Sequence, residues 1–225
     1  MSDPNVVERT FAFVDLAGFT ALTEAHGDAE AFATVRTFRE RAVTSIGTDD
    51  HLVKTIGDAL MFAFPDPDTA VTALCRLIDE ELQDPERNLL PRAGAHHGTA
   101  IANDGDYVGA AVNLASRVTG IARGGQVVTT ARVASAAKAQ HRTVFHLGPT
   151  LLRNIAEPVD LWEIQLGAAS RESAVDPVCA MRVVTEGPNA VSLAWNDTHV
   201  WFCSLQCVSR FAASPDSFTA RLTGE

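Results

Sequence analysis

The pattern of apolar and polar positions predicts short buried strands that alternate with amphipathic helices. An apolar run over residues 10–15 ends on a charge, which is typical of a buried strand. A turn and a short helix follow, Gly27 interrupts that helix, and Asp28 is placed to cap a second helix that reaches about Ile46. The apolar face of the second helix is expected to carry Phe32, Val35, Phe38 and Ala42.

The middle of the chain predicts a β-hairpin over residues 51–64, because two apolar runs flank a Gly57–Asp58 turn. The order of elements indicates an α+β fold in which helices cover one sheet. The remaining elements are expected to be a helix from Asp66 or Asp68 to about Gln83, a strand over 92–102, a helix over 109–122, and short strands around 126–130, 143–148 and 159–164.

The character of the chain changes near residue 170, which predicts two domains. Residues 1–166 carry the strands and helices, and residues 167–175 are small and polar, as in a linker. Residues 176–222 hold three of the four cysteines. A module of fewer than about 60 residues buries little apolar surface, so a metal ion bound to its cysteines would stabilise it.

Composition excludes several classes of partner. The 225 residues have a formal net charge of −10 and a pI of about 5.1, so neither nucleic acid nor an anionic membrane surface is an expected partner. No apolar run approaches the roughly 18 residues of a membrane span, and the first residues lack a signal-peptide pattern. The protein is therefore expected in the cytoplasm, where clustered cysteines indicate a metal or redox site rather than disulfides.

Two aspartates are the first candidates for chemistry. Asp15 ends an apolar strand, where an unpaired carboxylate would be costly, and Asp58 lies at the tip of the hairpin. Pairing these strands would bring the two carboxylates together, and they would repel unless a cation lay between them. Oxygen ligands of this kind suit Mg²⁺ or Mn²⁺. The alternative is that Asp15 caps the next helix and Asp58 is only a turn residue.

Four more polar residues complete the candidate site. Lys54 lies on the hairpin, and Asp106 lies in the turn before the helix at 109–122. An ammonium donor with a carboxylate acceptor suits adenine, whose ring nitrogen accepts a hydrogen bond and whose amino group donates one. Guanine presents the opposite pattern of donor and acceptor on that edge. Asn113 and Arg117 are four residues apart, so they share one helix face. The alternative is a surface lysine, a turn aspartate and an exposed helical pair.

The strings FVDLAGFT, VKTIGDALMF and GDYVGAAVNLASR resemble the class III nucleotidyl cyclases over roughly residues 8–166. The resemblance implies a ferredoxin-like core and the conversion of ATP into cyclic AMP and pyrophosphate, the work of a lyase in signal transduction. It assigns two Mg²⁺ or Mn²⁺ ions to Asp15, Asp58 and the Leu16 carbonyl. The remaining roles it implies are triphosphate binding by the amides of Phe19 and Thr20, adenine recognition by Lys54 and Asp106, ribose positioning by Asn113, and stabilisation of developing charge by Arg117.

The resemblance also predicts the oligomeric state. In this family the metal half and the base-binding half of each site come from different subunits, and this one chain carries both halves. A homodimer with two equivalent sites is therefore expected. Arg153 is the only basic residue in the late segment where relatives contact phosphate, and it is left outside the predicted site because its register is uncertain.

The strings DPVCAM, WFCSLQC and SPDSF resemble the YHS domain, a small metal-associated module. Cys203 and Cys207 are four residues apart and Cys179 follows a proline turn, so three thiolates are expected at one Zn²⁺ or Cu⁺ ion. His199 is a candidate fourth ligand, beside water or none. Many relatives have glycine where this chain has Ala180. The alternative is three cysteines that are simply buried.

Other functions remain open from the sequence. A catalytically silent nucleotide-binding or metal-sensing regulatory protein is one, and a cyclase that uses GTP is another; no GG(D/E)EF string indicates a diguanylate cyclase. His96 and His97 are adjacent on a predicted strand and so point to opposite faces, which favours structural roles. Cys75 lies on the apolar face of a helix and is expected to pack in the core.

Overall fold

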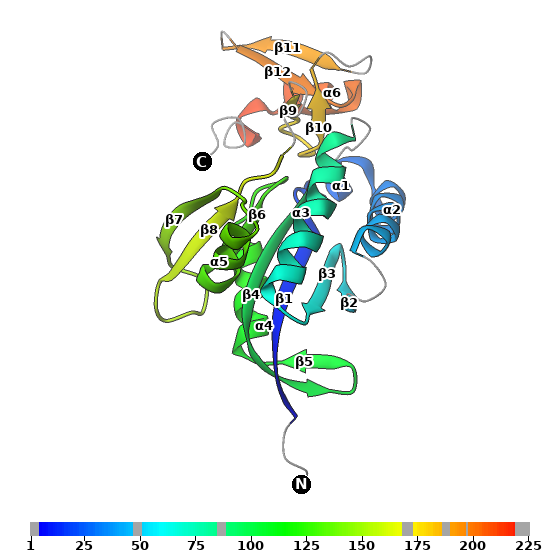
Figure 1. Ribbon diagram of the computed structural model, residues 1–225. Coiled ribbons are helices and arrows are strands. Elements are labelled where there is room, and N and C mark those ends of the chain that lie inside the picture. The colour runs from blue at the N-terminus through cyan, green and yellow to red at the C-terminus, as the bar shows by residue number, and fades with distance from the viewer. Residues whose placement is uncertain are drawn as a thin grey trace.

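The computed structural model describes residues 5–46, 51–84, 89–167, 173–185, 190–196 and 198–218. Its main sheet has the strand order β2-β3-β1-β4-β6-β8-β7, with β5 paired to β4 (Figure 1). Every neighbouring pair is antiparallel except β4 and β6. The strands are β1 Val6–Leu16, β2 His51–Ile56, β3 Ala59–Phe64, β4 Pro91–Asn103, β5 Asp106–Val108, β6 Val127–Thr130, β7 Val144–Thr150 and β8 Val159–Ile164.

Helices lie on both faces of this sheet. Side chains alternate along a strand, so Ala12 and Val14 of β1 pack into one apolar cluster, whereas Phe11 and Phe13 pack into another. The first cluster includes residues of five helices, one of them in the C-terminal part of the chain, and the second includes only α4 among the helices. The helices are α1 Phe19–His26, α2 Asp28–Ile46, α3 Pro67–Gln83, α4 Ala110–Thr119 and α5 Ala131–Ala139.

The structure confirms the predicted α+β fold and most of its elements. Asp66 caps α3, because its carboxylate accepts a hydrogen bond from the Thr69 amide at 2.8 Å. Helix α5 was not predicted: its sequence ARVASAAKA is rich in small residues and lacks a strong apolar stripe. The placement of Phe32 was wrong. The buried stripe of α2 runs through Ala31, Phe38 and Ala42, and Phe32 is 69% exposed beside it.

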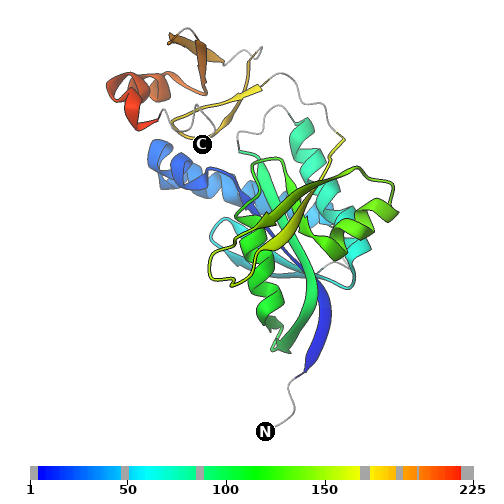
Figure 2. The ribbon, with the colours of Figure 1, turned by 90° about the vertical axis from the view of Figure 1, so that its left-hand side faces the viewer.

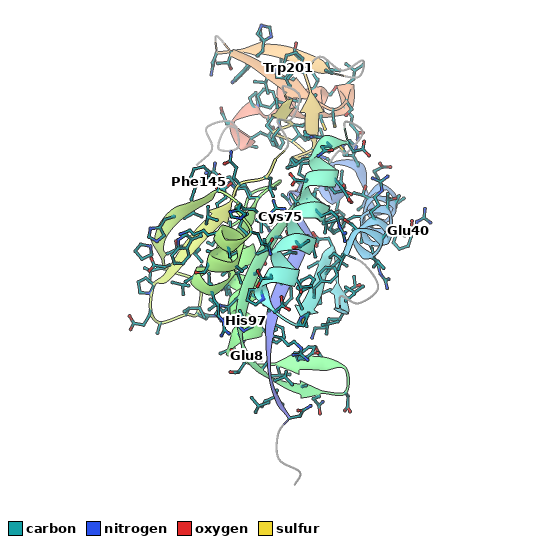
Figure 3. The ribbon with its side chains drawn as sticks, in the orientation of Figure 1. Glu8, Glu40, Cys75, His97, Phe145 and Trp201 are labelled. Carbon is teal, nitrogen blue, oxygen red and sulfur yellow. The ribbon has the colours of Figure 1, made fainter. Side chains whose placement is uncertain are left out.

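The predictions for Cys75 and the histidine pair are confirmed. Cys75 is fully buried on α3, and burial raises the pKa of its thiol to about 11 (Figure 3). His97 contacts Thr10 with 2.8 Å between Nδ1 and the hydroxyl, and it lies 3.2 Å from Glu8. His96 faces the other way, 2.8 Å from the Thr130 hydroxyl, and burial lowers its pKa to about 4.

The C-terminal module (residues 173–218) lies beyond one end of the main sheet, next to α1 (Figures 1 and 2). Two small sheets and a helix form it, and β9 includes the last three residues of the segment predicted as a linker. No described helix is both long and apolar enough to cross a membrane. The elements are β9 Ser173–Val175, β10 Arg182–Val184, β11 Val191–Trp195, β12 Thr198–Phe202, α6 Leu205–Ala213 and a 3₁₀ turn Pro215–Ser217.

The module shares its core with the larger domain. Phe202, Phe211 and Met181 belong to the same buried apolar cluster as residues of α1, α2 and α3. Arg182 is 8% exposed and donates to the carbonyls of Leu82 (2.8 Å) and Asp84, at the C-terminal end of α3. The orphan carbonyls of a helix end need such donors. A module too small for a full core thus buries its apolar side chains against its neighbour.

Candidate active site and cysteine cluster

Asp15 and Asp58 are neighbours in the structure, as the strand pattern predicts. Asp15 is near the end of β1, Asp58 is in the β2–β3 turn, and β1 pairs with β3. The Leu16 amide donates to Asp58 Oδ2 at 3.3 Å. Burial, and to a smaller extent the charge of Asp15, raises the pKa of Asp58. A bound cation would offset both the burial of the Asp58 carboxylate and its repulsion by Asp15.

Arg92 is the positive partner of Asp15, and sequence reasoning missed it. Its Nε donates to Asp15 Oδ1 at 2.5 Å and its Nη2 to Oδ2 at 3.2 Å, a two-point contact between guanidinium and carboxylate. The contact depends on the register of β1 and β4, which places Asp15 opposite Arg92 across 77 residues of chain. No local pattern in the sequence reports such a register.

The two aspartates line a cavity of about 330 Å³ where α1 begins. Backbone amides at a helix start have no partner within the helix, so they can bind an anion beside the carboxylates. Oxygen donors next to an anion-binding helix start are the donor set that a metal-bound triphosphate requires. The lining consists of Asp15, Leu16, Gly18, Phe19, Thr20, Ala21, Asp58, Arg92 and Ala180.

Lys54 and Asp106 form an ion pair, which brings two predicted residues together across 52 positions of sequence. The Lys54 ammonium donates to Asp106 Oδ1 at 2.8 Å and to Oδ2 at 2.6 Å. This bond, with one from the Tyr107 amide, lowers the pKa of Asp106. The side chains are 38% and 43% exposed, so a ligand can reach both. A donor and an acceptor are therefore held side by side.

Asn113 and Arg117 lie on the exposed face of α4. Neither side chain makes a hydrogen bond or an ion pair with the residues that the structure describes. Lys54 is opposite Met61 and therefore faces the same side of the sheet as α4. By alternation from Phe13, Asp15 also faces this side.

The predicted site residues do not all meet within one chain. Asp15 lies opposite Arg92 at one end of β4, and Asp106 lies opposite Asn103 at the other end of this 13-residue strand. The cavity around Asp15 is lined by neither Lys54 nor Asp106. The structure therefore places Asp15 and Asp58 in one group and Lys54 and Asp106 in another. Arg153 is exposed and lies outside both.

The three C-terminal cysteines converge, as predicted, but their fourth neighbour was not predicted. Sγ of Cys203 lies 3.5 Å from Sγ of Cys179 and 3.8 Å from Sγ of Cys207. Nε2 of His26, the last residue of α1, lies 3.7 Å from the sulfurs of Cys203 and Cys207. His199, which the sequence left as one candidate beside water or none, lies outside this cluster: it is exposed on β12 and its ring lies near that of Trp201. A lone histidine at a helix end gives no sequence signal for such a contact.

A buried carboxylate holds the cysteine turns in place. Asp176 is fully buried, and its oxygens accept hydrogen bonds from the amides of Val178 (2.8 Å) and Cys203 (2.9 Å). Burial raises the pKa of Asp176 despite these bonds. Ser204 caps α6 by accepting from the Cys207 amide at 3.3 Å. Hydrogen bonds from Cys179 and Cys203 lower the pKa of the Cys207 thiol.

Ala180 connects the cysteine cluster to the cavity. Ala180 follows Cys179 and has a φ of 61°. It packs on Gly18, because a Cβ added to Gly18 would lie only 2.3 Å from the Cβ of Ala180. Gly18 has a φ of +85° and precedes α1; Gly27 has the same φ but nothing within 4 Å. Their ψ angles differ, 10° at Gly18 and 172° at Gly27, so a side chain would meet different backbone strain at the two positions.

Gly18→Ala should destabilise the protein more in the wild-type background than in an Ala180→Gly background. In both backgrounds the new Cβ lies in the left-handed region, at a cost of about 1–2 kcal/mol, and only in the first does it also collide with the Cβ of Ala180. Adding Ala180→Gly should remove the excess cost of Gly18→Ala. Urea unfolding of the single variants and the double variant measures these differences. An equal cost of Gly18→Ala in both backgrounds would show that Ala180 does not contact Gly18 in solution.

The chain matches known proteins over its first three quarters. The model of the adenylate and guanylate cyclase catalytic domain matches residues 4–162. The chain is 35% identical over 170 residues to a pH-sensitive adenylate cyclase of Mycobacterium tuberculosis, with 73% of this chain and 42% of that protein covered. It is 40% identical over 123 residues to an adenylate cyclase of Streptomyces griseus, with 53% and 31% covered. The chain thus spans less than half the length of these curated relatives.

Solved structures share the fold of the main domain. The adenylyl cyclase CyaB from P. aeruginosa aligns with a TM-score of 0.62 at 19% identity and covers 75% of this chain and 99% of its own. An adenylate cyclase of Trypanosoma brucei in its monomeric state aligns with a TM-score of 0.60 at 26% identity, covering 70% and 89%. The region matched by the family model ends before the cysteine module.

Proposed function

The chain belongs to the family of adenylate and guanylate cyclase catalytic domains, and we propose that it is an adenylate cyclase, a lyase that converts ATP into 3′,5′-cyclic AMP and pyrophosphate. The Lys54–Asp106 pair carries the choice of ATP. On binding, the ammonium donates to a ring nitrogen of adenine and the carboxylate accepts from its amino group. Guanine would leave both groups mispaired, which is costly in a site built on hydrogen bonds. The names of the relatives agree with this choice.

The carboxylates fit Mg²⁺ or Mn²⁺, the ions that cyclases of this family use. Asp58 is partly buried and is repelled by the charge of Asp15, and a bound cation would offset both costs. Asp15, Asp58 and the Leu16 carbonyl would hold two ions, with Arg92 giving up its contact with Asp15. The ions supply Lewis-acid activation of the ribose 3′-hydroxyl and neutralise charge on the triphosphate.

The chain's own groups position the substrate for in-line attack. The 3′-oxygen forms a bond to the α-phosphorus, the bond from that phosphorus to the bridging oxygen of pyrophosphate breaks, and the hydroxyl proton passes to solvent. Amides of Phe19 and Thr20 bind the triphosphate, and Asn113 orients the ribose. Arg117 donates to the phosphate oxygens on which negative charge develops.

We propose a homodimer that places each metal half opposite the base half of its partner. The opposed ends of β4 support this arrangement, because one chain alone leaves its halves apart. The exposed Asn113 and Arg117 and the half-exposed Lys54 all lie on the α4 side of the sheet. A second copy packed on this side would complete both sites.

We further propose that residues 176–222 are a YHS-like module that binds Zn²⁺ or Cu⁺ and regulates the enzyme, after a linker at 167–175 and a catalytic domain over 1–166. The converging thiols support metal binding, and the contact of Ala180 with Gly18 supports regulation. The enzyme would act in the cytoplasm, where ATP is available and thiols stay reduced. Unchanged turnover after chelation and metal addition would exclude regulation.

One observation favours a second function, a catalytically silent nucleotide-binding protein. Asp15 is bonded to Arg92 at two points, so an ion must displace a guanidinium to reach it. Against this reading, the chain has all six of the polar residues that the resemblance assigns to the site, namely Asp15, Lys54, Asp58, Asp106, Asn113 and Arg117.

The test of substrate choice offers ATP and GTP in parallel, with Mg²⁺ or Mn²⁺. Wild-type protein should form cyclic AMP and little cyclic GMP. The double variant Lys54→Glu, Asp106→Lys keeps an ion pair but exchanges donor and acceptor, so the ratio of kcat/KM for ATP over GTP should fall at least about 100-fold. A folded double variant with an unchanged ratio would show that this pair does not read the base.

A further inference from the structure

We propose that His26, Cys179, Cys203 and Cys207 form one Zn²⁺ site that fastens the C-terminal module to helix α1 of the catalytic domain. Three ligands come from the module, and the fourth is the last residue of α1. The inference deepens the proposed metal-binding role of the module and is independent of cyclase activity. The metal site would then lie between the module and the catalytic domain and link them, rather than lie within the module alone.

The distances match a tetrahedral zinc site. With Zn–S near 2.3 Å and Zn–N near 2.05 Å, tetrahedral geometry places two sulfurs about 3.8 Å apart and a sulfur and a nitrogen about 3.6 Å apart. In the structure Sγ of Cys203 lies 3.5 Å from that of Cys179 and 3.8 Å from that of Cys207, and Nε2 of His26 lies 3.7 Å from the sulfurs of Cys203 and Cys207. The four ligand atoms all lie within 4.8 Å of one another. These thiols are too far apart to be disulfide-bonded.

The surroundings fit a structural site rather than a catalytic one. Three sulfurs and one imidazole fill four positions, and closed Cys₃His sets are typical of structural zinc. Cys179 and Cys207 are fully buried, so two of the four ligands are shielded from water, whereas His26 and Cys203 are partly exposed. Asp176 supplies a second shell, because it binds the backbone amide of Cys203 and fixes the turn that carries Cys179.

The module contacts both ends of α1. At the C-terminal end, Gln206 donates to the Ala25 carbonyl at 3.3 Å and Arg210 to the Glu24 carbonyl at 2.9 Å, next to His26. At the N-terminal end, Ala180 lies on Gly18 and lines the cavity that holds Asp15 and Asp58. Helix α1 is eight residues long, so one ion bound at its end fixes the helix that begins the proposed triphosphate site.

The experiment measures Zn²⁺ affinity of the reduced full-length chain by competition with a chromophoric chelator. Wild type should bind one ion per chain at the cluster. His26→Ala should weaken binding by more than the roughly 10–100-fold that second-shell changes cost. His199→Ala, which alters a histidine of the module outside the cluster, is the matched control and should bind as wild type does. His26→Cys restores four ligands and should recover tight binding.

A second readout tests the link between the domains. Amide hydrogen exchange in α1 and in the turn over residues 176–181 should accelerate in His26→Ala and in zinc-free wild type, but not in His199→Ala. Several outcomes would overturn the proposal: equal affinity in His26→Ala and wild type, no stoichiometric Zn²⁺ on the reduced chain, or weak binding in both His26 variants while α1 exchanges as in wild type. None of these readouts needs turnover, so they leave the proposed cyclase activity untouched.

Discussion

Asp58→Asn should abolish cyclic AMP formation and leave the metal-free protein at least as stable as wild type. The amide keeps the size of the side chain and an oxygen acceptor for the Leu16 amide, but removes one of the two charges that would hold the ions. Metal ions that stabilise charge in a transition state contribute several kcal/mol, so kcat should fall at least about 1000-fold. A purely structural Asp58 would give the opposite pattern, with lost stability and retained turnover.

The pH dependence of stability sharpens this prediction. Because burial raises the pKa of Asp58 above its unfolded value, its contribution to stability is fully present below the unfolded pKa, which is about 4, and is lost as pH rises through the folded pKa. Near neutral pH the ionised carboxylate therefore destabilises the metal-free fold. The advantage of Asp58→Asn should appear at pH 7 and disappear near pH 4.

Urea unfolding with chelator at both pH values, and then with Mg²⁺, checks the expectation. Mg²⁺ should stabilise wild type and should have little effect on Asp58→Asn. The matched control is Asp66→Asn, which changes the residue that caps α3 and lies outside the cavity. The hydrogen bond from the Thr69 amide lowers the pKa of the Asp66 carboxylate, so the sign of its pH dependence is opposite to that of Asp58. Equal stabilisation of wild type and Asp58→Asn by Mg²⁺ would show that Asp58 does not hold the ion.

The sequence predicted what depends on local pattern. An apolar strand that ends on Asp15 and a hairpin with Asp58 at its tip were enough to place the two carboxylates together, because neighbouring strands of an antiparallel sheet bring such ends together. The approach of Lys54 to Asp106 came from the family resemblance. The ion pair spans 52 positions, and no periodicity links a strand residue to a distant turn.

Contacts that depend on strand register or on the docking of the module could not be predicted. Arg92 reaches Asp15 through the register of two strands, and His26 reaches the cysteines through the docking of one unit on another. Phe32 shows a related limit, because Ala31 and Phe32 are adjacent and helical spacing allows either one on the face of Phe38 and Ala42. In the structure Ala31 is 3% exposed and Phe32 is 69% exposed, so the buried stripe starts one residue earlier than predicted.

Mixing Asp58→Asn chains with Arg117→Ala chains should restore activity that neither chain has alone. Each homodimer would lose both sites, one through its metal half and the other through the exposed arginine of α4. In a heterodimer one site would receive both altered halves and the other would receive both intact ones. With free exchange of subunits in an equal mixture, half of the dimers are mixed, so roughly a quarter of the wild-type sites should be active.

Two different affinity tags isolate the heterodimer, which should then show about half of the wild-type rate per dimer. The matched control pairs Asp58→Asn with Asp15→Ala. Both changes fall in the metal half, so every site in that mixed dimer stays defective and no activity should return. Recovery in the control as well would point to contamination or to partial activity of a single variant. A verified heterodimer of the first pair with no activity would show that the two halves act within one chain, in spite of their separation along β4.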